Sequence, residues 1–345
     1  MPTIEQIDPP QLPMSSPATR ILFALAFPIA LLSGPATAAQ NHGAASQLRT
    51  TEVTEASHPF ETLHCARQPI QVRFIGKLAE VVVNNESRTL LQAMSASGAR
   101  YVAPGDDTTV FWGKGAFANV TWSGQPLPLC APSGAIIPPY RASGNEPFWA
   151  VTYDGWRATL KRPGEPDLIR DAQIAETSAK GQTLVAGEGI DAWRLEATDG
   201  LCVDSMSGMP RPQHTTLHYQ SNAMHGCGGD PERLLQGVSW RITHIGDQSV
   251  NGASAAHILF LADNRIAGST GCNRFFGQYT LTGEALSFKG VGSTRMACPP
   301  ELMAQEGVFL KMLASVNRFS FEASDAQRLL LHTDGADIRV EAQAM

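Results

Sequence analysis

The cysteines constrain the fold of this chain more than any other feature. There are six of them, and they fall in pairs into three consecutive segments of similar size. Six cysteines allow several connectivities, and pairing within each segment is the simplest, giving three small domains with one disulfide each. Because the sequence holds no C-x-x-C spacing, disulfides explain these residues better than a metal site. The predicted bridges are Cys65–Cys130, Cys202–Cys227 and Cys272–Cys298.

The N-terminal sequence predicts an oxidising compartment, in which such bridges persist. Arg20 precedes the apolar run ILFALAFPIALL, and the small-residue sequence ATAAQ follows as a cleavage site. The run is shorter than the roughly 20 residues of a membrane span, so we expect residues 1–38 to be a signal peptide and not an anchor. No cysteine precedes Cys65 to carry a lipid. The sequence therefore predicts a soluble periplasmic or secreted protein without a stable membrane span.

Composition marks the boundaries of the predicted domains. Residues 39–57 are small and polar, which is typical of a flexible lead-in. The proline-rich sequence APSGAIIPP at 131–139 indicates a linker, which we place at 133–139, and GGDPERLLQ marks a second break. We therefore expect domains at residues 58–132, 140–230 and 233–345.

Short alternating apolar runs predict a mainly β protein. Segments such as IQVRFIG, AEVVVN, FWAVTYD and HILFLAD are separated by Gly, Asn, Asp or Pro turns, which is typical of antiparallel sheets or small barrels. The segment PPELMAQEGVFLKMLASVN predicts a helix that covers the sheet of the third domain, because prolines stand at its start and its apolar residues share one face. That face holds Leu302, Phe309, Leu310, Leu313 and Val316. Strands and helices do not alternate, so a parallel nucleotide-binding sheet is not expected.

Charge and motifs argue against nucleic acid and against catalysis. The net charge is -6 at pH 7, and the basic residues do not cluster on one stretch, as a nucleic-acid site would require. Patterns of serine hydrolases, zinc proteases and P-loops are absent. His214 and His218 lack a third ligand nearby, and the adjacent Asp106 and Asp107 suit a turn better than an acid–base pair. We therefore expect no enzyme, no metal and no cofactor.

The segment SASGARYVAPGDDTTVFWGKG, at residues 95–115, holds the candidate binding residues. Ser97 and Lys114 are polar residues on neighbouring bends, and Gly98 and Gly115 let the backbone turn beside them. The stretch VAPGDDTT between the bends predicts a loop. Read from spacing alone, Ser97 and Lys114 are ordinary solvated turn residues.

With Cys65 before it and Cys130 after it, this segment resembles the MliC/PliC family of periplasmic inhibitors of c-type lysozyme, over about residues 58–132. The resemblance implies an antiparallel barrel of eight strands with one disulfide, whose bends enter the lysozyme cleft. It places the inhibitory serine on Ser97 and the inhibitory lysine on Lys114. The matching framework residues are Gly98, Tyr101, Trp112 and Gly115, and we expect the two aromatic residues to brace the bends.

Two other functions stay open for the same residues. Ser97 and Lys114 could form a hydrolytic dyad, but this chemistry needs a buried, deprotonated lysine, and a lysine beside Gly115 at a corner is too exposed. The barrel could also be a scaffold in an envelope-stress interaction protein that does not inhibit lysozyme.

The third segment carries GSTGCNRFFGQYTLTGEALSF, then STRMACP and a helix with Glu306 and Phe309. It resembles the META domain of the HslJ heat-shock family over about residues 234–342, which implies an α+β domain with one main helix and a link to envelope stress. Asn273 and Arg274 are expected to fix a turn.

The middle segment begins RASGNEPFWAV and resembles an uncharacterised bacterial envelope family marked by its Asn-Glu-Pro-Phe-Trp run. The resemblance extends to the cysteine pair of this segment. We expect Asn145, Glu146 and Trp149 to form a strand-entry corner closed by Pro147, with a pocket as the alternative.

Overall fold

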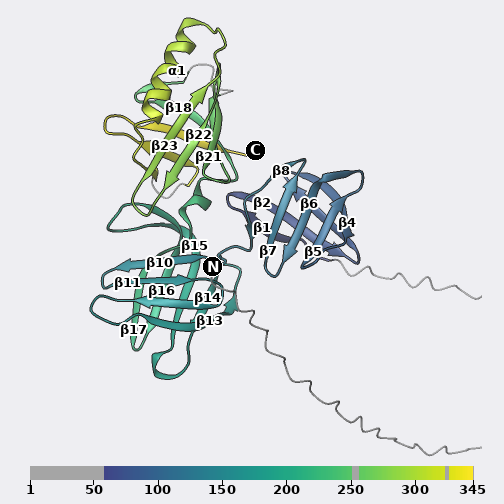
Figure 1. Ribbon diagram of the computed structural model, residues 1–345, viewed down its shortest axis with the longest axis vertical. Helices are drawn as coiled ribbons and strands as arrows, with labels where there is room; N and C mark the ends of the chain where they lie inside the picture. Colours follow the sequence, from purple (N-terminus) through teal and green to yellow (C-terminus); the bar gives the residue numbers. More distant parts are fainter. Residues whose placement is uncertain (1–57, 251–255, 323–325, 345) are drawn as a thin grey trace, which may run out of the picture. The chain divides into compact units, whose positions relative to one another are not determined.

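The computed structural model describes residues 58–250, 256–322 and 326–344. The predicted signal peptide and lead-in therefore lie outside the described residues. The described chain forms three antiparallel sheets, whose strands are labelled in Figure 1. Each sheet lies within one of the three expected domain ranges, and the mainly β prediction is confirmed.

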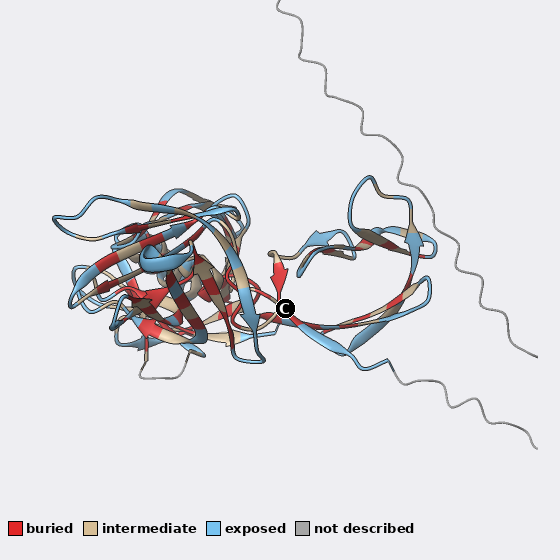
Figure 2. Ribbon diagram, turned by 90° about the horizontal axis from the view of Figure 1, so that it is seen from below, coloured by how far each residue is buried: buried red, intermediate tan, exposed pale blue. Residues whose placement is uncertain are grey.

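The first sheet is a ring of strands around an apolar core. Its strands are β1 (Glu61–Cys65), β2 (Gln68–Ile75), β3 (Leu78–Val83), β4 (Glu86–Ala93), β5 (Ala99–Ala103), β6 (Asp106–Lys114), β7 (Phe117–Trp122), β8 (Gln125–Pro126) and β9 (Cys130–Ala131). They pair in the order β6-β5-β4-β3-β2-β1-β9-β7-β8, and β6 also pairs with β7, which closes the ring. Buried residues alternate with more exposed ones along strands such as β3, and Figure 2 colours the ribbon by burial. We call this sheet the first barrel.

The stretch predicted as a loop between the two bends is mostly strand. Ala103 of β5 pairs with Asp106 of β6, so only Pro104 and Gly105 form the turn between them. The Asp106 carboxylate accepts hydrogen bonds from the Thr108 backbone N at 3.0 Å and the Thr109 hydroxyl at 2.6 Å. Proline and glycine make a tight turn possible, and these side-chain bonds stabilise the polar strand that follows.

The middle sheet is a closed barrel of eight antiparallel strands. They are β10 (Tyr140–Asn145), β11 (Phe148–Tyr153), β12 (Arg157–Lys161), β13 (Leu168–Thr177), β14 (Gly181–Ala186), β15 (Trp193–Val203), β16 (Pro210–Tyr219) and β17 (Asn222–Gly228), with the short helix η1 (Gly189–Asp191). Trp149 is fully buried in this barrel. A Cβ at Gly144 would lie 2.4 Å from the Trp149 indole, and one at Gly226 would lie 2.8 Å from it, so both glycines make room for the ring.

The third sheet follows the short helix η2 (Pro231–Leu234) and is covered by one α-helix. Its strands are β18 (Ser239–Ile245), β19 (Gln248–Ser249), β20 (Ala256–Leu261), β21 (Arg265–Thr270), β22 (Arg274–Leu281), β23 (Leu286–Ser293), β24 (Arg318–Phe321), β25 (Arg328–His332) and β26 (Ile338–Gln343). The helix α1 (Pro300–Leu313) contacts β18, β21 and β26 and buries Phe309 and Leu313. The predicted helix is confirmed, and Val316 is buried just beyond its end.

Disulfides join the cysteines within each sheet in the simplest pairing: Cys65 with Cys130, Cys202 with Cys227, and Cys272 with Cys298. In the part of the chain that the structure describes, no helix combines the length and apolar character needed to cross a membrane.

Candidate functional site

Three connections meet at one end of the first barrel. Neighbouring strands are antiparallel, so every second connection lies at the same end. These are the β2–β3 turn at 76–77, the β4–β5 connection at 94–98 and the β6–β7 turn at 115–116. We call this end the rim. The Lys77 carbonyl of the first turn accepts a hydrogen bond of 2.9 Å from the Gln92 backbone N, which joins that turn to β4.

Ser97 is exposed on the rim, and its backbone is held from two sides. The Trp112 indole Nε1 donates a hydrogen bond of 2.9 Å to the Ser97 carbonyl. The Ser95 hydroxyl donates to the same oxygen at 2.5 Å. Trp112 thus lies against the bend that presents the serine, the arrangement expected of a bracing residue.

Gly98 brings this bend into direct contact with β6. Its φ is +68°, and a Cβ there would lie only 2.3 Å from the Gly113 carbonyl oxygen. No larger residue fits such an approach of two backbones. Because Gly113 immediately precedes Lys114, the bend that carries Ser97 lies beside the residue that precedes the candidate lysine.

Lys114 ends β6 at a tight hairpin. It pairs with Phe117 across a turn of two residues, and Gly115 takes a φ of +61° in the first turn position. Lys114 is exposed and lies on the outer face of β6, as does Trp112 two residues before it. Tyr101 faces the other way: it is buried, and its ring centroid lies 5.4 Å from that of Phe74. Tyr101 therefore belongs to the core behind the rim.

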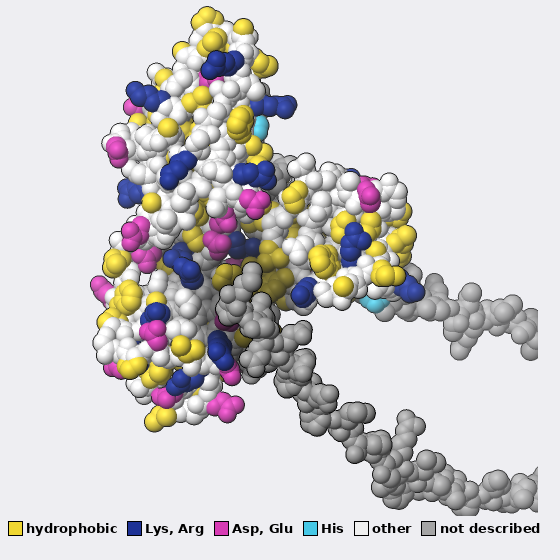
Figure 3. All heavy atoms as spheres, viewed as in Figure 1, with side chains coloured by type: hydrophobic (Ala, Val, Ile, Leu, Met, Phe, Trp, Pro, Cys, Tyr) yellow, Lys and Arg dark blue, Asp and Glu magenta, His cyan; other side chains and the backbone are white. Residues whose placement is uncertain are grey.

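The rim carries positive charge. Lys77, Arg100 and Lys114 lie on it or next to it, and within the described residues no salt bridge involves any of them. Figure 3 shows Lys and Arg side chains among apolar ones on the visible face of this barrel. Lys77 and Arg100 were missed from the sequence, since only the strand pairing brings them to the same end as Lys114.

Three of the five acidic residues at 58–132 are paired with cations. Glu80 lies 2.6 Å from Arg73, and the hydrogen bond from Arg73 lowers the pKa of this carboxyl. Glu86 and Asp106 contact Arg88 at the opposite end of the barrel, at 2.6 Å and 3.0 Å. These three carboxylates are thus engaged by cations other than Lys77, Arg100 and Lys114.

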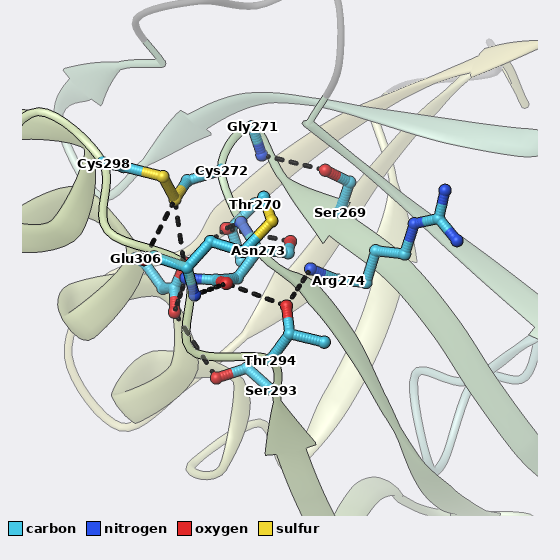
Figure 4. The surroundings of a disulfide bond; sticks show 11 residues. Ser269, Thr270, Gly271, Cys272, Asn273, Arg274, Ser293, Thr294, Cys298 and Glu306 are labelled. Atoms are coloured by element: carbon cyan, nitrogen blue, oxygen red, sulfur yellow. Dashed lines mark hydrogen bonds between the residues drawn. A yellow bond between two sulfur atoms is a disulfide. The ribbon is translucent and has the colours of Figure 1, made fainter.

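A second polar cluster lies beside the disulfide of the third sheet (Figure 4). The Glu306 carboxylate on α1 accepts hydrogen bonds from the Thr270 hydroxyl at 2.7 Å and from Asn273 Nδ2 at 3.2 Å. Asn273 is buried, and its Oδ1 accepts from the Met296 backbone N at 2.8 Å. Only the backbone N of Arg274 joins this cluster, through the Thr294 hydroxyl at 3.1 Å. The cluster fastens the helix to the bend after β21, so Asn273 fixes a turn as expected.

The Asn-Glu-Pro-Phe-Trp run forms the hairpin turn between β10 and β11. Asn145 Nδ2 donates to the Ser205 hydroxyl at 2.9 Å and to Asp204 at 3.3 Å. Asn145 and Glu146 also line a groove of about 430 Å³. Trp149 does not line it, because its side chain is inside the barrel. Asn145 and Glu146 therefore belong both to the predicted corner and to a groove, whereas Trp149 belongs to the barrel core.

Comparison with known proteins supports two of the resemblances. Residues 64–127 match the family MliC, described as membrane-bound lysozyme-inhibitor of c-type lysozyme, and residues 233–344 match the META domain. No curated protein matches the chain. An NMR structure of a protein from Burkholderia xenovorans is 26% identical over 33% of this chain and 87% of its own, with a TM-score of 0.29. A second NMR structure is 26% identical over 32% and 92%, with a TM-score of 0.28. The chain therefore combines an MliC region with a META domain.

Proposed function

We propose that this chain is an exported inhibitor of c-type lysozyme, and that the rim of the first barrel occupies the active-site cleft of the enzyme. The observation that carries the proposal is the joint presentation of Ser97 and Lys114. Both are exposed, and the contact of Gly98 with Gly113 holds their bends together. The match of residues 64–127 to a lysozyme-inhibitor family supports the same reading.

The chemistry of the two groups suits the cleft of a lysozyme. Such an enzyme keeps one carboxyl group protonated in an apolar pocket and a second one ionised. The Lys114 ammonium would pair with the ionised carboxylate. The Ser97 hydroxyl both donates and accepts, so it would satisfy the other carboxyl in either protonation state. The positive rim would also favour approach to an acidic cleft.

Alanine substitution tests these roles. Truncating one member of a desolvated charged pair costs about 2 to 5 kcal/mol, so Lys114→Ala should weaken inhibition of hen-type lysozyme by at least about 30-fold. Ser97→Ala should weaken it as well. Lys180→Ala is the matched control, because Lys180 is an exposed lysine of the middle barrel. Equal inhibition by the Lys114 and Lys180 variants, or no inhibition by the unaltered protein at micromolar excess, would overturn the proposal.

The META match favours a second function, interaction with an envelope-stress partner, in which the first barrel serves only as a scaffold. In that case the protein would not inhibit lysozyme at all. Measuring inhibition of lysozyme by the unaltered protein therefore separates the two functions. Substitutions at Ser97 and Lys114 should change activity only if the protein is an inhibitor.

A further inference from the structure

An apolar row crosses the outer wall of the first barrel. Strand pairing places its members side by side on β2 to β6, in the order Ile75, Leu78, Leu91, Val102, Val110. They face outward, because the residues next to them in the chain, such as Ala79, Leu90 and Phe111, are buried in the core. Ile75 is 41% exposed and Leu91 49%, and the other three are partly exposed. We call these five residues the apolar row.

Such a row is unusual on a barrel that faces water on its outer side. Single exposed apolar residues are common and need no explanation, whereas contiguous ones mark surfaces that another molecule covers. Directly paired side chains on neighbouring strands lie about 5 Å apart, so the members of the row form one continuous strip. Alternation of polar and apolar residues would have made this face polar, as it does at Glu80 and Arg73 nearby.

The row lies close to the candidate inhibitory residues. Two residues nearer the rim, on the same outer face of β4, β5 and β6, lie Ala93, Arg100 and Trp112. Arg100 pairs with both Ala93 and Trp112. Val110 is four residues from Lys114 along β6, or about 14 Å. A stable complex buries about 800 Å² on each partner, which two side chains alone do not supply. A protein that held Lys114 in its cleft would therefore extend over the neighbouring wall.

We propose that the apolar row is a second part of the lysozyme-binding surface and packs against an apolar edge of the enzyme's cleft. The inference rests on the proposed function. Charge favours lysozyme over a second copy of this chain as the occupant. A symmetric pair of copies offers the row only the same patch, with the same Arg100 and Lys114 beside it, whereas an acidic cleft attracts both residues.

The test is a double variant, Ile75→Thr with Leu91→Thr, in the full chain. Both positions are exposed and threonine suits strands, so the barrel should fold, which hydrogen exchange of residues 58–131 would verify. Inhibition of lysozyme should fall by about 10-fold or more, mainly through faster dissociation. This loss should change little with salt, whereas the long-range attraction of Lys114 to the cleft should weaken at high salt. Ile169→Thr, at a residue of β13 that is 54% exposed, is the matched control.

The outcomes separate this inference from the proposed function. If Lys114→Ala loses inhibition and the double variant does not, the apolar row is not part of the interface and the proposed function stands. If the unaltered protein does not inhibit, both fail. If the unaltered protein is a dimer, the double variant a monomer and inhibition unchanged, the row joins two copies and the inference is wrong.

Discussion

Replacing Gly98 by alanine should disable the inhibitor without unfolding it. The new Cβ would lie 2.3 Å from the Gly113 carbonyl oxygen, and the bend must retreat by about 1 Å before the contact becomes ordinary. That movement also stretches the bond between the Trp112 indole and the Ser97 carbonyl, which measures 2.9 Å. A binding residue displaced by this distance loses its fit, so inhibition should fall by about 30-fold or more.

Gly105→Ala is the control that separates displacement of the Ser97 bend from the strain of a side chain at positive φ. Gly105 has a φ of +75°, close to the +68° of Gly98, but a Cβ there would meet nothing within 4 Å. Both variants carry the cost of a side chain at positive φ, about 1 to 2 kcal/mol. Gly105 lies in the turn at the other end of the same hairpin, away from the rim.

The assay is a titration of both variants against lysozyme, with hydrogen exchange of residues 58–131 to measure stability. We expect the Gly105 variant to inhibit as fully as the unaltered protein. In the Gly98 variant, protection from exchange should be lost near Ser97, while exchange at the turn of Gly105 should resemble that of the unaltered protein. If Gly98→Ala inhibited as well as the unaltered protein, the close approach of the two backbones would not position Ser97, and the reasoning would be refuted.

Acid should loosen the middle barrel through Asp204. Burial by itself would raise the pKa of this carboxyl, but hydrogen bonds from Ser207 and Asn145 outweigh it and lower the pKa below its usual value. Its contribution is therefore present above about pH 4 and is lost as the pH falls through the lowered pKa, so Asp204→Ala should speed hydrogen exchange less at about pH 2.5 than at about pH 6. Equal effects at both values would contradict this. A different prediction concerns Ser320, whose hydroxyl lies 2.7 Å from His332 Nε2, while His332 Nδ1 lies 3.0 Å from Asp337. Hydrolysis also needs an oxyanion hole, and Ser320 lies within strand β24 and not at a nucleophile turn, so we expect no labelling by a fluorophosphonate. Labelling that is lost in Ser320→Ala would instead reveal an enzyme.

The sequence supports the fold better than it supports the details of the site. Alternating strands, the helix after Pro299 and the simplest cysteine pairing all follow from local patterns, and the structure agrees with them. The supposed loop at VAPGDDTT is wrong because Asp106 and its threonines look like loop residues. Their side chains bond to one another and thereby allow a polar strand.

The positions of Ser97 and Lys114 could be proposed from a family resemblance, but their surroundings could not. Lys77, Arg100 and the apolar row come together only through pairing between strands, and this register is not encoded in any single stretch of sequence. Outward-facing Leu78 and Leu91 also look like core residues when they are read along the chain. For this reason the extent of the candidate interface became visible only in three dimensions.

The closing of the first barrel has a practical consequence for anyone who isolates it. β9 is only two residues long, yet it pairs with both β1 and β7, and its Cys130 carries the disulfide to Cys65. The region that matches the inhibitor family ends at residue 127, before this strand begins. A fragment that ends at residue 127 would lack both β9 and the disulfide, so an inhibition assay of it would test an incomplete barrel. A fragment that continues through Ala131 would retain both.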